Sequence, residues 1–385
     1  MKNDDHLPGH SRRDFIKGFS LLLGSAALGA PYLAQGLDRL TRPGEHQFFS
    51  GDRAKKKLGI ALVGLGSYST HQLAPALAET ENCYLAGIVT GTPAKAETWK
   101  KKYNIPDKNI YTYKTFDQIK DNPAIDIVYV VLPNAMHAEY TIRAAQAGKH
   151  VISEKPMATS VADAERMIAA CKAHQVSLSV GYRLHYEPHN LRAMELGQKQ
   201  VYGKVKTIKT ENGFVMNNAG SWRLNKELAG GGPLMDMGIY CVQGACYTVG
   251  QTPVAVTAKF GEVTRPRVFD EVEQSIDWQL EFPNGALASC GSSYNENVSY
   301  LHAEAEKGWW HLEPAYGYGG ITGKTSEGPM HLPQVNQQAL QMDGIAQSIL
   351  ENKASRVPGE MGLRDVKILM AIYEAARTGK KVRIA

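Results

Sequence analysis

The sequence contains few cysteines, and their positions suit neither disulfide nor metal chemistry. Only five of the 385 residues are cysteine. Disulfide-rich secreted domains use even sets of cysteines at regular spacings, and zinc sites need closely spaced pairs. We therefore expect buried free thiols, no disulfide framework and no metal centre. The five cysteines are scattered, mostly in apolar stretches: Cys83, Cys171, Cys241, Cys246 and Cys290.

Strong net charge and internal repeats are also absent. The net charge is only +5, and the charged residues, 21% of the chain, are spread along it. Such a pattern excludes a basic stripe for nucleic acid, so we expect a small-molecule partner and no nucleic acid. A length of 385 residues with 43% hydrophobic residues predicts a globular protein of two domains, because a single core rarely grows so large.

The apolar run near the N-terminus is too short to span a membrane. It extends from Gly18 to Ala30, whereas a span needs roughly 20 residues. It follows the pair Arg12 and Arg13, which is typical of a twin-arginine export signal; the alternative is a helix that merely begins with two arginines. We predict a signal peptide over residues 1–34, a polar arm over 35–57, no stable membrane span after export, and a periplasmic protein exported already folded.

Two different patterns of predicted strands and helices follow the arm. Over residues 58–183, short Val/Ile/Leu runs alternate with amphipathic stretches, which predicts a Rossmann parallel sheet covered on both faces. Over residues 184–385, strands follow one another directly and a helical tail runs from Gln334 to Gly379. This predicts an α+β domain for substrate binding and oligomerisation, with a large, mainly antiparallel open sheet. Apolar residues alternate in IDWQLEF and ALASCGSSY, so we expect a second copy to cover that face, in a homodimer or homotetramer.

The segment GLGSYS, residues 64–69, stands between the first predicted strand and a helix. In a dinucleotide site the first glycine, here Gly64, makes the tight turn, and the second, Gly66, admits the pyrophosphate to the helix N-terminus. The third glycine of that motif is missing, and Ser69 takes its place. The position of the segment in a strand-turn-helix context still predicts a dinucleotide site.

No carboxylate ends the second predicted strand. Sites specific for NAD carry Asp or Glu there to bind the ribose 2′-hydroxyl. This chain has Thr90, Gly91 and Lys95 instead. The absence of a repelling acid and the presence of a lysine favour NADP, although Lys95 also fits an ordinary surface lysine.

Two further strands end in polar motifs. DIVYVVLPN ends at Pro133 and Asn134, and HVISEKP at Glu154 and Lys155. Ligands bind at the carboxyl edge of an open parallel sheet, which predicts that Lys155 lies beside the cofactor. Its ammonium can donate to substrate and favours the ionised form of a nearby phenol. The alternative is a lysine that only pairs with Glu154.

Together, GLGSYS, LPNAMHAEY, AGKHVISEKPMA and GGGPLMDMGIY resemble the Gfo/Idh/MocA oxidoreductases, over essentially all of residues 58–383. The segments SEKPMATSVADAERMI, GYRLHYEPHN and WRLNKELAGGGPLMDMGIY are similar to the periplasmic glucose-fructose and aldose-aldose oxidoreductases of that family. Those enzymes are exported by twin-arginine signals and hold NADP tightly.

The resemblance implies roles for individual residues. Tyr240 would accept the C1 hydroxyl proton while Lys155 orients the substrate and tunes this base. Asp236, one helical turn before Tyr240, would bind a sugar hydroxyl. Tyr240 also fits a core tyrosine, Asp236 a structural carboxylate, and Trp222 a packing residue. Sugar contacts are expected from Tyr182, Arg183, Trp222 and Arg223, and cofactor contacts from Gly64, Gly66, Ser67, Tyr68, Thr90, Gly91, Lys95, Leu132, Pro133, Asn134, His137, Glu154, Lys155 and Arg183.

These features predict an NADP-dependent oxidoreductase acting on sugars. It would oxidise an aldose at C1 to the aldonolactone and pass the hydride to a second sugar from a retained cofactor. Three alternatives stay open: an aldose dehydrogenase with exchangeable NAD(P), an NAD-dependent glycosidase on the same fold, and a sugar sensor without catalysis. The retained lysine and tyrosine favour the oxidoreductase over the last two.

Overall fold

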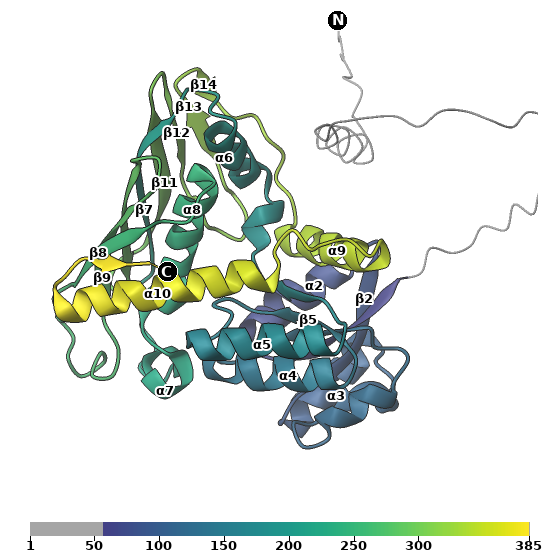
Figure 1. The fold of residues 1–385 in the computed structure, drawn as a ribbon. Helices are drawn as coiled ribbons and strands as arrows, with labels where there is room; N and C mark the ends of the chain where they lie inside the picture. Colours follow the sequence, from purple (N-terminus) through teal and green to yellow (C-terminus); the bar gives the residue numbers. More distant parts are fainter. Residues whose placement is uncertain (1–56, 385) are drawn as a thin grey trace, which may run out of the picture. The chain divides into compact units, whose positions relative to one another are not determined.

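The computed structural model describes residues 57–384, which form two β-sheets with helices packed on them (Figure 1). The predicted signal peptide and nearly all of the predicted arm lie outside these residues. Within the described part of the chain, no helix is both long and apolar enough to cross a membrane. All five cysteines are buried and free, as predicted.

The first sheet is parallel, with strand order β3-β2-β1-β4-β5-β6. Every residue of β1 and β4 is buried, because helices cover both faces of these central strands. This confirms the predicted Rossmann sheet. Its elements are β1 (Leu58–Val63), η1 (Ser69–Leu73), α2 (Ala74–Leu77), β2 (Cys83–Val89), α3 (Pro93–Tyr103), η2 (Asp107–Asn109), β3 (Ile110–Tyr111), η3 (Phe116–Asp121), β4 (Ile127–Val130), η4 (Asn134–Met136), α4 (His137–Gln146), β5 (His150–Ser153), α5 (Val161–Ala173), β6 (Leu178–Val180) and η5 (Arg183–Tyr186).

The second sheet has nine strands in the order β14-β13-β12-β11-β7-β10-β9-β8-β15. Its pairs are antiparallel except β7 with β10, which is parallel. The mainly antiparallel sheet is therefore confirmed. Its elements are α6 (Pro188–Gln198), β7 (Val205–Gly213), η6 (Trp222–Leu224), α7 (Lys226–Ala229), η7 (Leu234–Gly238), α8 (Ile239–Val249), β8 (Ala255–Phe260), β9 (Ser275–Glu281), β10 (Leu287–Ser293), β11 (Val298–Ala305), β12 (Trp309–Leu312), β13 (Gly323–Thr325), β14 (Gly328–Pro329), α9 (Gln337–Leu350), α10 (Gly359–Thr378) and β15 (Val382–Arg383).

The apolar face of this second sheet is covered by helices of the same chain. Ile276, Trp278 and Leu280 on β9 are buried, whereas Asp277 between them is exposed. Helix α10 packs on β8, and α8 packs on β7 and β10. The apolar alternation therefore reflects intramolecular packing, and the expectation that it requires a second copy was wrong in its reasoning. The opposite face carries polar side chains such as Asp277.

Helix α10 packs against both halves of the molecule, the first built around the parallel sheet (residues 58–186) and the second around the nine-stranded sheet (residues 188–383). It contacts α5 and β6 of the first half and β8 and α8 of the second (Figure 1). Val366 and Leu369 lie buried on its apolar face, and Gly379 ends it in the left-handed conformation with φ of +66°. The prediction of this helix and of its stop signal was correct. Helix α9 packs on η5, α2 and β2, so the chain returns to the first sheet before its last strand, β15, joins the second.

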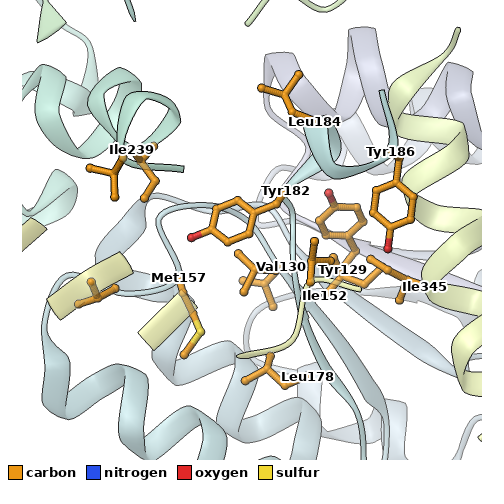
Figure 2. Packing of buried hydrophobic residues seen from close by; sticks show 14 of the residues in the cluster. Tyr129, Val130, Ile152, Met157, Leu178, Tyr182, Leu184, Tyr186, Ile239 and Ile345 are labelled. Atoms are coloured by element: carbon orange, nitrogen blue, oxygen red, sulfur yellow. The ribbon is translucent and has the colours of Figure 1, made fainter. Parts of the chain in front are cut away.

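One apolar cluster joins the two halves. Figure 2 shows side chains from the first sheet and η5 packed with Ile239 of α8 and Ile345 of α9. Burial of this shared surface fixes η5 and the start of α8 beside the carboxyl edge of the first sheet. The candidate functional residues lie at this junction.

Candidate active site

The glycine turn follows β1 and has the geometry that a dinucleotide site needs. Gly64 has φ of +94°, and a Cβ there would lie 2.3 Å from the carbonyl oxygen of Val131. By contrast, among the described residues no heavy atom lies within 4 Å of a Cβ built on Gly66. The space in front of Gly66 is therefore open at the point where helical residues begin, at Ser67. This cradle fits a pyrophosphate approaching the backbone and the helix N-terminus.

Ser69 replaces the third glycine of the motif without disturbing the turn. Its buried hydroxyl donates to the carbonyl oxygen of Gly64 at 2.6 Å. A small polar residue thus holds the helix against the strand by a hydrogen bond where the usual motif relies on close backbone contact.

We predict opposite consequences for the two glycines. Gly64→Ala is expected to lower the free energy of unfolding by about 2 kcal/mol or more, because left-handed strain alone costs about 1–3 kcal/mol. Gly66→Ala is expected to change stability by less than about 0.5 kcal/mol, yet to weaken dinucleotide binding about tenfold or more, because its methyl group fills the cradle. Urea unfolding and titration with NADP measure the two effects. A Gly66→Ala protein with undiminished affinity would contradict the placement of the pyrophosphate.

Polar residues after β2 lie beside the same turn. Lys95, in the first turn of α3, donates from Nζ to the carbonyl oxygen of Leu65 at 3.2 Å. The hydroxyl of Thr90 accepts from the backbone N–H of Thr92 at 3.2 Å. Lys95 thus lies next to the cradle, where its charge can meet a phosphate. Gly91, which follows Thr90 after β2, is exposed.

Lys155 follows β5 and is held at the junction by residues of η7 and α8. Its Nζ donates to the backbone carbonyl of Asp236 at 2.7 Å and lies 3.5 Å from the Asp236 carboxylate. The same ammonium lies 4.5 Å from the centroid of the Tyr240 ring. Only 13% of the lysine side chain is exposed. Its partners are therefore Asp236 and Tyr240, in place of the simple pairing with Glu154.

Tyr240 lies between two cations. The Arg183 guanidinium is 5.2 Å from the centroid of its ring, and Arg183 Nη2 donates to the Tyr240 hydroxyl at 3.3 Å. With Lys155 against the ring as well, two positive charges surround one phenol.

Asp236 is a buried carboxylate with charged partners on two sides. Arg223 donates from Nε to Oδ2 at 2.8 Å, and the Tyr294 hydroxyl donates to the same oxygen at 3.1 Å. Burial alone would raise the pKa of Asp236, but Arg223 and Lys155 hold this pKa below its ordinary value. The carboxylate is therefore ionised at neutral pH. The Arg223 guanidinium also lies 4.7 Å from the Trp222 ring, so these two residues form one unit.

Arg183 connects this cluster to a loop that sequence reasoning did not assign to the site. Besides Tyr240, it bonds the carbonyl oxygens of Tyr316 and Gly317 and the side chain of Gln337. Tyr294, Tyr316, Tyr318 and Gln337 had no periodic or motif signal in the sequence. Aromatic residues between glycines in AYGYGG were the only indication of an unusual loop.

Several residues predicted for the site are engaged with the backbone or core. Both ring nitrogens of His137 face carbonyl oxygens, of Pro156 and Leu132, each at 2.9 Å. Asn134 donates to the carbonyl oxygen of Ala229 at 2.8 Å. These contacts hold the β4 end in shape and leave His137 without a nitrogen for proton transfer. Leu132 and Pro133 complete this turn, in which the Leu132 side chain borders Gly64.

Glu154 points into the first half of the molecule. It accepts from the Tyr129 hydroxyl at 2.6 Å and from the backbone N–H of Lys155 at 3.2 Å. Burial raises the pKa of Glu154 above its ordinary value. Gln341 of α9 donates to the same Tyr129 hydroxyl at 2.9 Å. A buried chain of hydrogen bonds therefore connects Gln341, Tyr129 and Glu154, the first residue of the EKP motif.

Tyr182, which the sequence predicts to contact sugar, has its hydroxyl away from the cluster of Lys155, Asp236 and Tyr240. Its side chain is buried in the apolar cluster (Figure 2). Its hydroxyl donates to the Asp365 carboxylate of α10 at 2.7 Å. Gln243 of α8 donates to the same carboxylate oxygen. Tyr182 is the N-cap residue of η5 and Arg183 its first residue, and the two side chains have different partners: Tyr182 bonds Asp365, whereas Arg183 reaches Tyr240.

We predict that Tyr182→Phe affects stability and not sugar binding. Removing a buried donor from a carboxylate costs about 1.5–3 kcal/mol, so the free energy of unfolding measured in urea is expected to fall by that amount. The KM for sugar is expected to stay within about twofold, since the hydroxyl lies away from the cluster. An increase in KM without loss of stability would return Tyr182 to the sugar pocket.

Comparisons with known proteins agree with this architecture. The family model described as "Oxidoreductase family, NAD-binding Rossmann fold" matches residues 58–182, and the Gfo/Idh/MocA C-terminal domain matches residues 190–321. The D-xylose 1-dehydrogenase [NADP(+)] of Haloarcula marismortui is 30% identical over 338 residues, which cover 84% of this chain and 92% of that one. The D-glucoside 3-dehydrogenase of Escherichia coli is 25% identical, over 85% of this chain and 97% of that one.

A solved structure gives a higher identity. The crystal structure of aldose-aldose oxidoreductase from Caulobacter crescentus, complexed with glycerol, is 44% identical and superposes with a TM-score of 0.83. The match covers 85% of this chain and 100% of that one. With both family models placed on the two sheets described above, the chain belongs to the Gfo/Idh/MocA family of oxidoreductases.

Proposed function

We propose that the protein is an NADP-dependent sugar oxidoreductase that oxidises an aldose at C1 to the aldonolactone and passes the hydride to a second sugar. The observation that carries the proposal is the Tyr240 phenol between the cations of Lys155 and Arg183, with Asp236 alongside and the glycine turn at the same junction. The aldose-aldose oxidoreductase and D-xylose 1-dehydrogenase relatives support a sugar as the substrate.

The residues of the cluster divide the work of alcohol oxidation. A bound nicotinamide supplies the site that takes up the hydride. Tyr240 Oη, acting as phenolate, takes the proton of the sugar hydroxyl, and the hydrogen bond from Arg183 stabilises the negative charge that this oxygen carries before the transfer. The ionised Asp236 accepts a hydrogen bond from a sugar hydroxyl and so orients the ring. Lys155, fixed by the carbonyl of Asp236, keeps its remaining N–H groups for substrate and holds positive charge against the phenol.

The preference for NADP over NAD rests on charge. The end of β2 carries no acid, and Lys95 lies against the glycine turn. A 2′-phosphate would therefore meet a lysine and no repelling carboxylate. Gly64, Gly66, Ser67, Tyr68, Thr90 and Gly91 are the surrounding residues proposed to hold the nucleotide.

Tight retention and periplasmic location belong to the same proposal. The twin-arginine sequence at Arg12 and Arg13 supports export of a folded protein with its cofactor in place. An enzyme that retains one NADP in the periplasm must reoxidise the bound cofactor before the next turnover, and a second sugar as hydride acceptor would do this. We also propose a homodimer or homotetramer assembled through the polar face of the second sheet.

An ordinary dehydrogenase with exchangeable NAD(P) is the second candidate. It is favoured by the name of the Haloarcula relative, D-xylose 1-dehydrogenase [NADP(+)], which names one sugar and NADP and no second sugar. The same cluster serves both reactions, so the cofactor's exchange rate decides between them.

One spectroscopic experiment separates these possibilities. The full-length protein is purified without added nucleotide, and the absorbance of reduced nicotinamide is recorded as glucose and then fructose are added. Our proposal expects the band to rise with the first sugar and to fall with the second. A rise only when NADP is supplied indicates the exchangeable dehydrogenase. A glycosidase would release sugar from a glycoside with no net change in the band, and a protein with no response at all would refute the oxidoreductase.

A further inference from the structure

The loop between β12 and β13 reaches from the second sheet to the glycine-turn helix. The ring of Tyr318 in this loop lies 5.6 Å from the ring of Tyr68, centroid to centroid. Tyr68 is the second helical residue after the glycine turn. The Arg183 guanidinium lies 4.5 Å from the centroid of the Tyr318 ring. Tyr318 therefore contacts both sides of the junction at which cofactor and substrate are proposed to meet.

The base of this loop is firmly held. Arg183, only 2% exposed, donates from Nη2 to the carbonyl oxygen of Tyr316 at 2.6 Å and from Nη1 to that of Gly317 at 2.8 Å. Gln337 of α9 donates to the Gly317 carbonyl at 3.1 Å. The Tyr316 side chain is buried, and its hydroxyl is 2.5 Å from that of Thr210 on β7. One arginine thus anchors the loop and contacts the catalytic phenol.

The tip of the loop has the opposite character. Tyr318 is 51% exposed, whereas Tyr316 two residues earlier is 4% exposed. Gly317 precedes Tyr318, and Gly319 and Gly320 follow it, so three residues without side chains surround one large ring. Around Gly319 and Gly320, the described part of the chain places no atom within 4 Å of a built Cβ. Glycine backbone adopts many conformations at little cost, so the ring can leave Tyr68 while the anchor stays in place.

We propose that the segment Tyr316–Gly320 is a strap whose ring, Tyr318, closes over the bound dinucleotide and slows its release. The inference rests on the proposed function and deepens it, since it assigns retention of NADP to particular residues. Closure is stabilised by the Tyr68 ring and by the Arg183 guanidinium, which together hold an aromatic ring that is otherwise exposed. Tyr318 acts here as a positioning residue, and no proton transfer is assigned to it.

The test measures release of nucleotide separately from turnover. Full-length protein loaded with NADPH is mixed with excess NADP, and the fall in nicotinamide fluorescence gives the dissociation rate. Tyr318→Ala is expected to dissociate about tenfold faster or more, because it removes both ring contacts. Tyr318→Phe keeps the ring and is expected to stay within about twofold of wild type. Tyr84→Ala, which removes an exposed tyrosine near the N-terminal end of β2, at the end of the strand opposite the glycine turn, is the matched control.

The possible outcomes are distinct. Unchanged dissociation from Tyr318→Ala, in a protein whose thermal unfolding matches wild type, overturns the strap and leaves the proposed function intact. Equal acceleration in Tyr318→Phe and Tyr318→Ala overturns the role of the ring. A wild-type protein that takes up no NADPH fails at the level of the proposed function, and the strap fails with it.

Discussion

Replacing Tyr240 with phenylalanine is expected to lower kcat by about 10²–10⁴-fold, the range typical of removing a general base. The substitution deletes one oxygen and keeps the ring between Lys155 and Arg183, whose contacts with the ring face do not need the hydroxyl. The protein should therefore fold, retain nucleotide and bind sugar, while no phenol is present to take the proton. Single-turnover reduction of the bound nicotinamide by glucose measures the loss at the chemical step.

The matched control for Tyr240→Phe is Tyr300→Phe. The Tyr300 hydroxyl donates to Glu211 at 2.8 Å on the polar face of the second sheet, away from the cluster. Its removal is expected to leave kcat within about twofold of wild type. If Tyr240→Phe reduced the nicotinamide as fast as this control does, Tyr240 would not be the base, and Tyr318 would be the next phenol to test.

Lys155→Met is expected to lower kcat on the order of 10²–10³-fold, because it removes the ammonium while keeping a side chain of similar length. Three contacts disappear together: the hydrogen bond to the Asp236 carbonyl, the ion pair with the Asp236 carboxylate and the charge against the Tyr240 ring. Asp236 keeps Arg223 and Tyr294 as partners, so the carboxylate is not left buried without a hydrogen bond. Steady-state kinetics with glucose as donor, together with the nucleotide content after purification, separates loss of chemistry from loss of cofactor.

Lys259→Met serves as the control for Lys155→Met. Lys259 is 79% exposed and lies 3.7 Å from Asp277 on the polar face of the second sheet. An exposed ion pair contributes little to stability, so the same change of residue type should be silent there. Full turnover by Lys155→Met would remove the ammonium from the mechanism and leave Arg183 as the sole cation acting on Tyr240.

The parts of the site that could be predicted from sequence follow from regular geometry. Lys155 was placed at the carboxyl edge because its strand ends there, and Asp236 was placed beside Tyr240 because residues four apart share a helix face. Gly64 and Gly66 were identified by their position between strand and helix. Each inference used only local spacing and one rule of sheet topology.

The remaining parts depended on contacts between distant segments. Arg183 meets the Tyr316 loop across 133 residues of sequence, and the loop has neither helical nor strand periodicity that would reveal this contact. The contact of Tyr182 with Asp365 could not be predicted, because a motif does not show which of two adjacent residues faces the cluster. For the second sheet, alternation in β9 identified an apolar face correctly, but it does not indicate whether helices of the same chain or another subunit cover it.

The placement of α10 on both halves bears on how nucleotide enters and leaves. Hinge opening between the two sheets would have to separate α10 from one of them and break one of the bonds that Asp365 makes with Tyr182 and Gln243. The position of α10 therefore disfavours a wide hinge opening between the two sheets. We therefore expect nucleotide to exchange through small local movements, while the two sheets keep their relative positions.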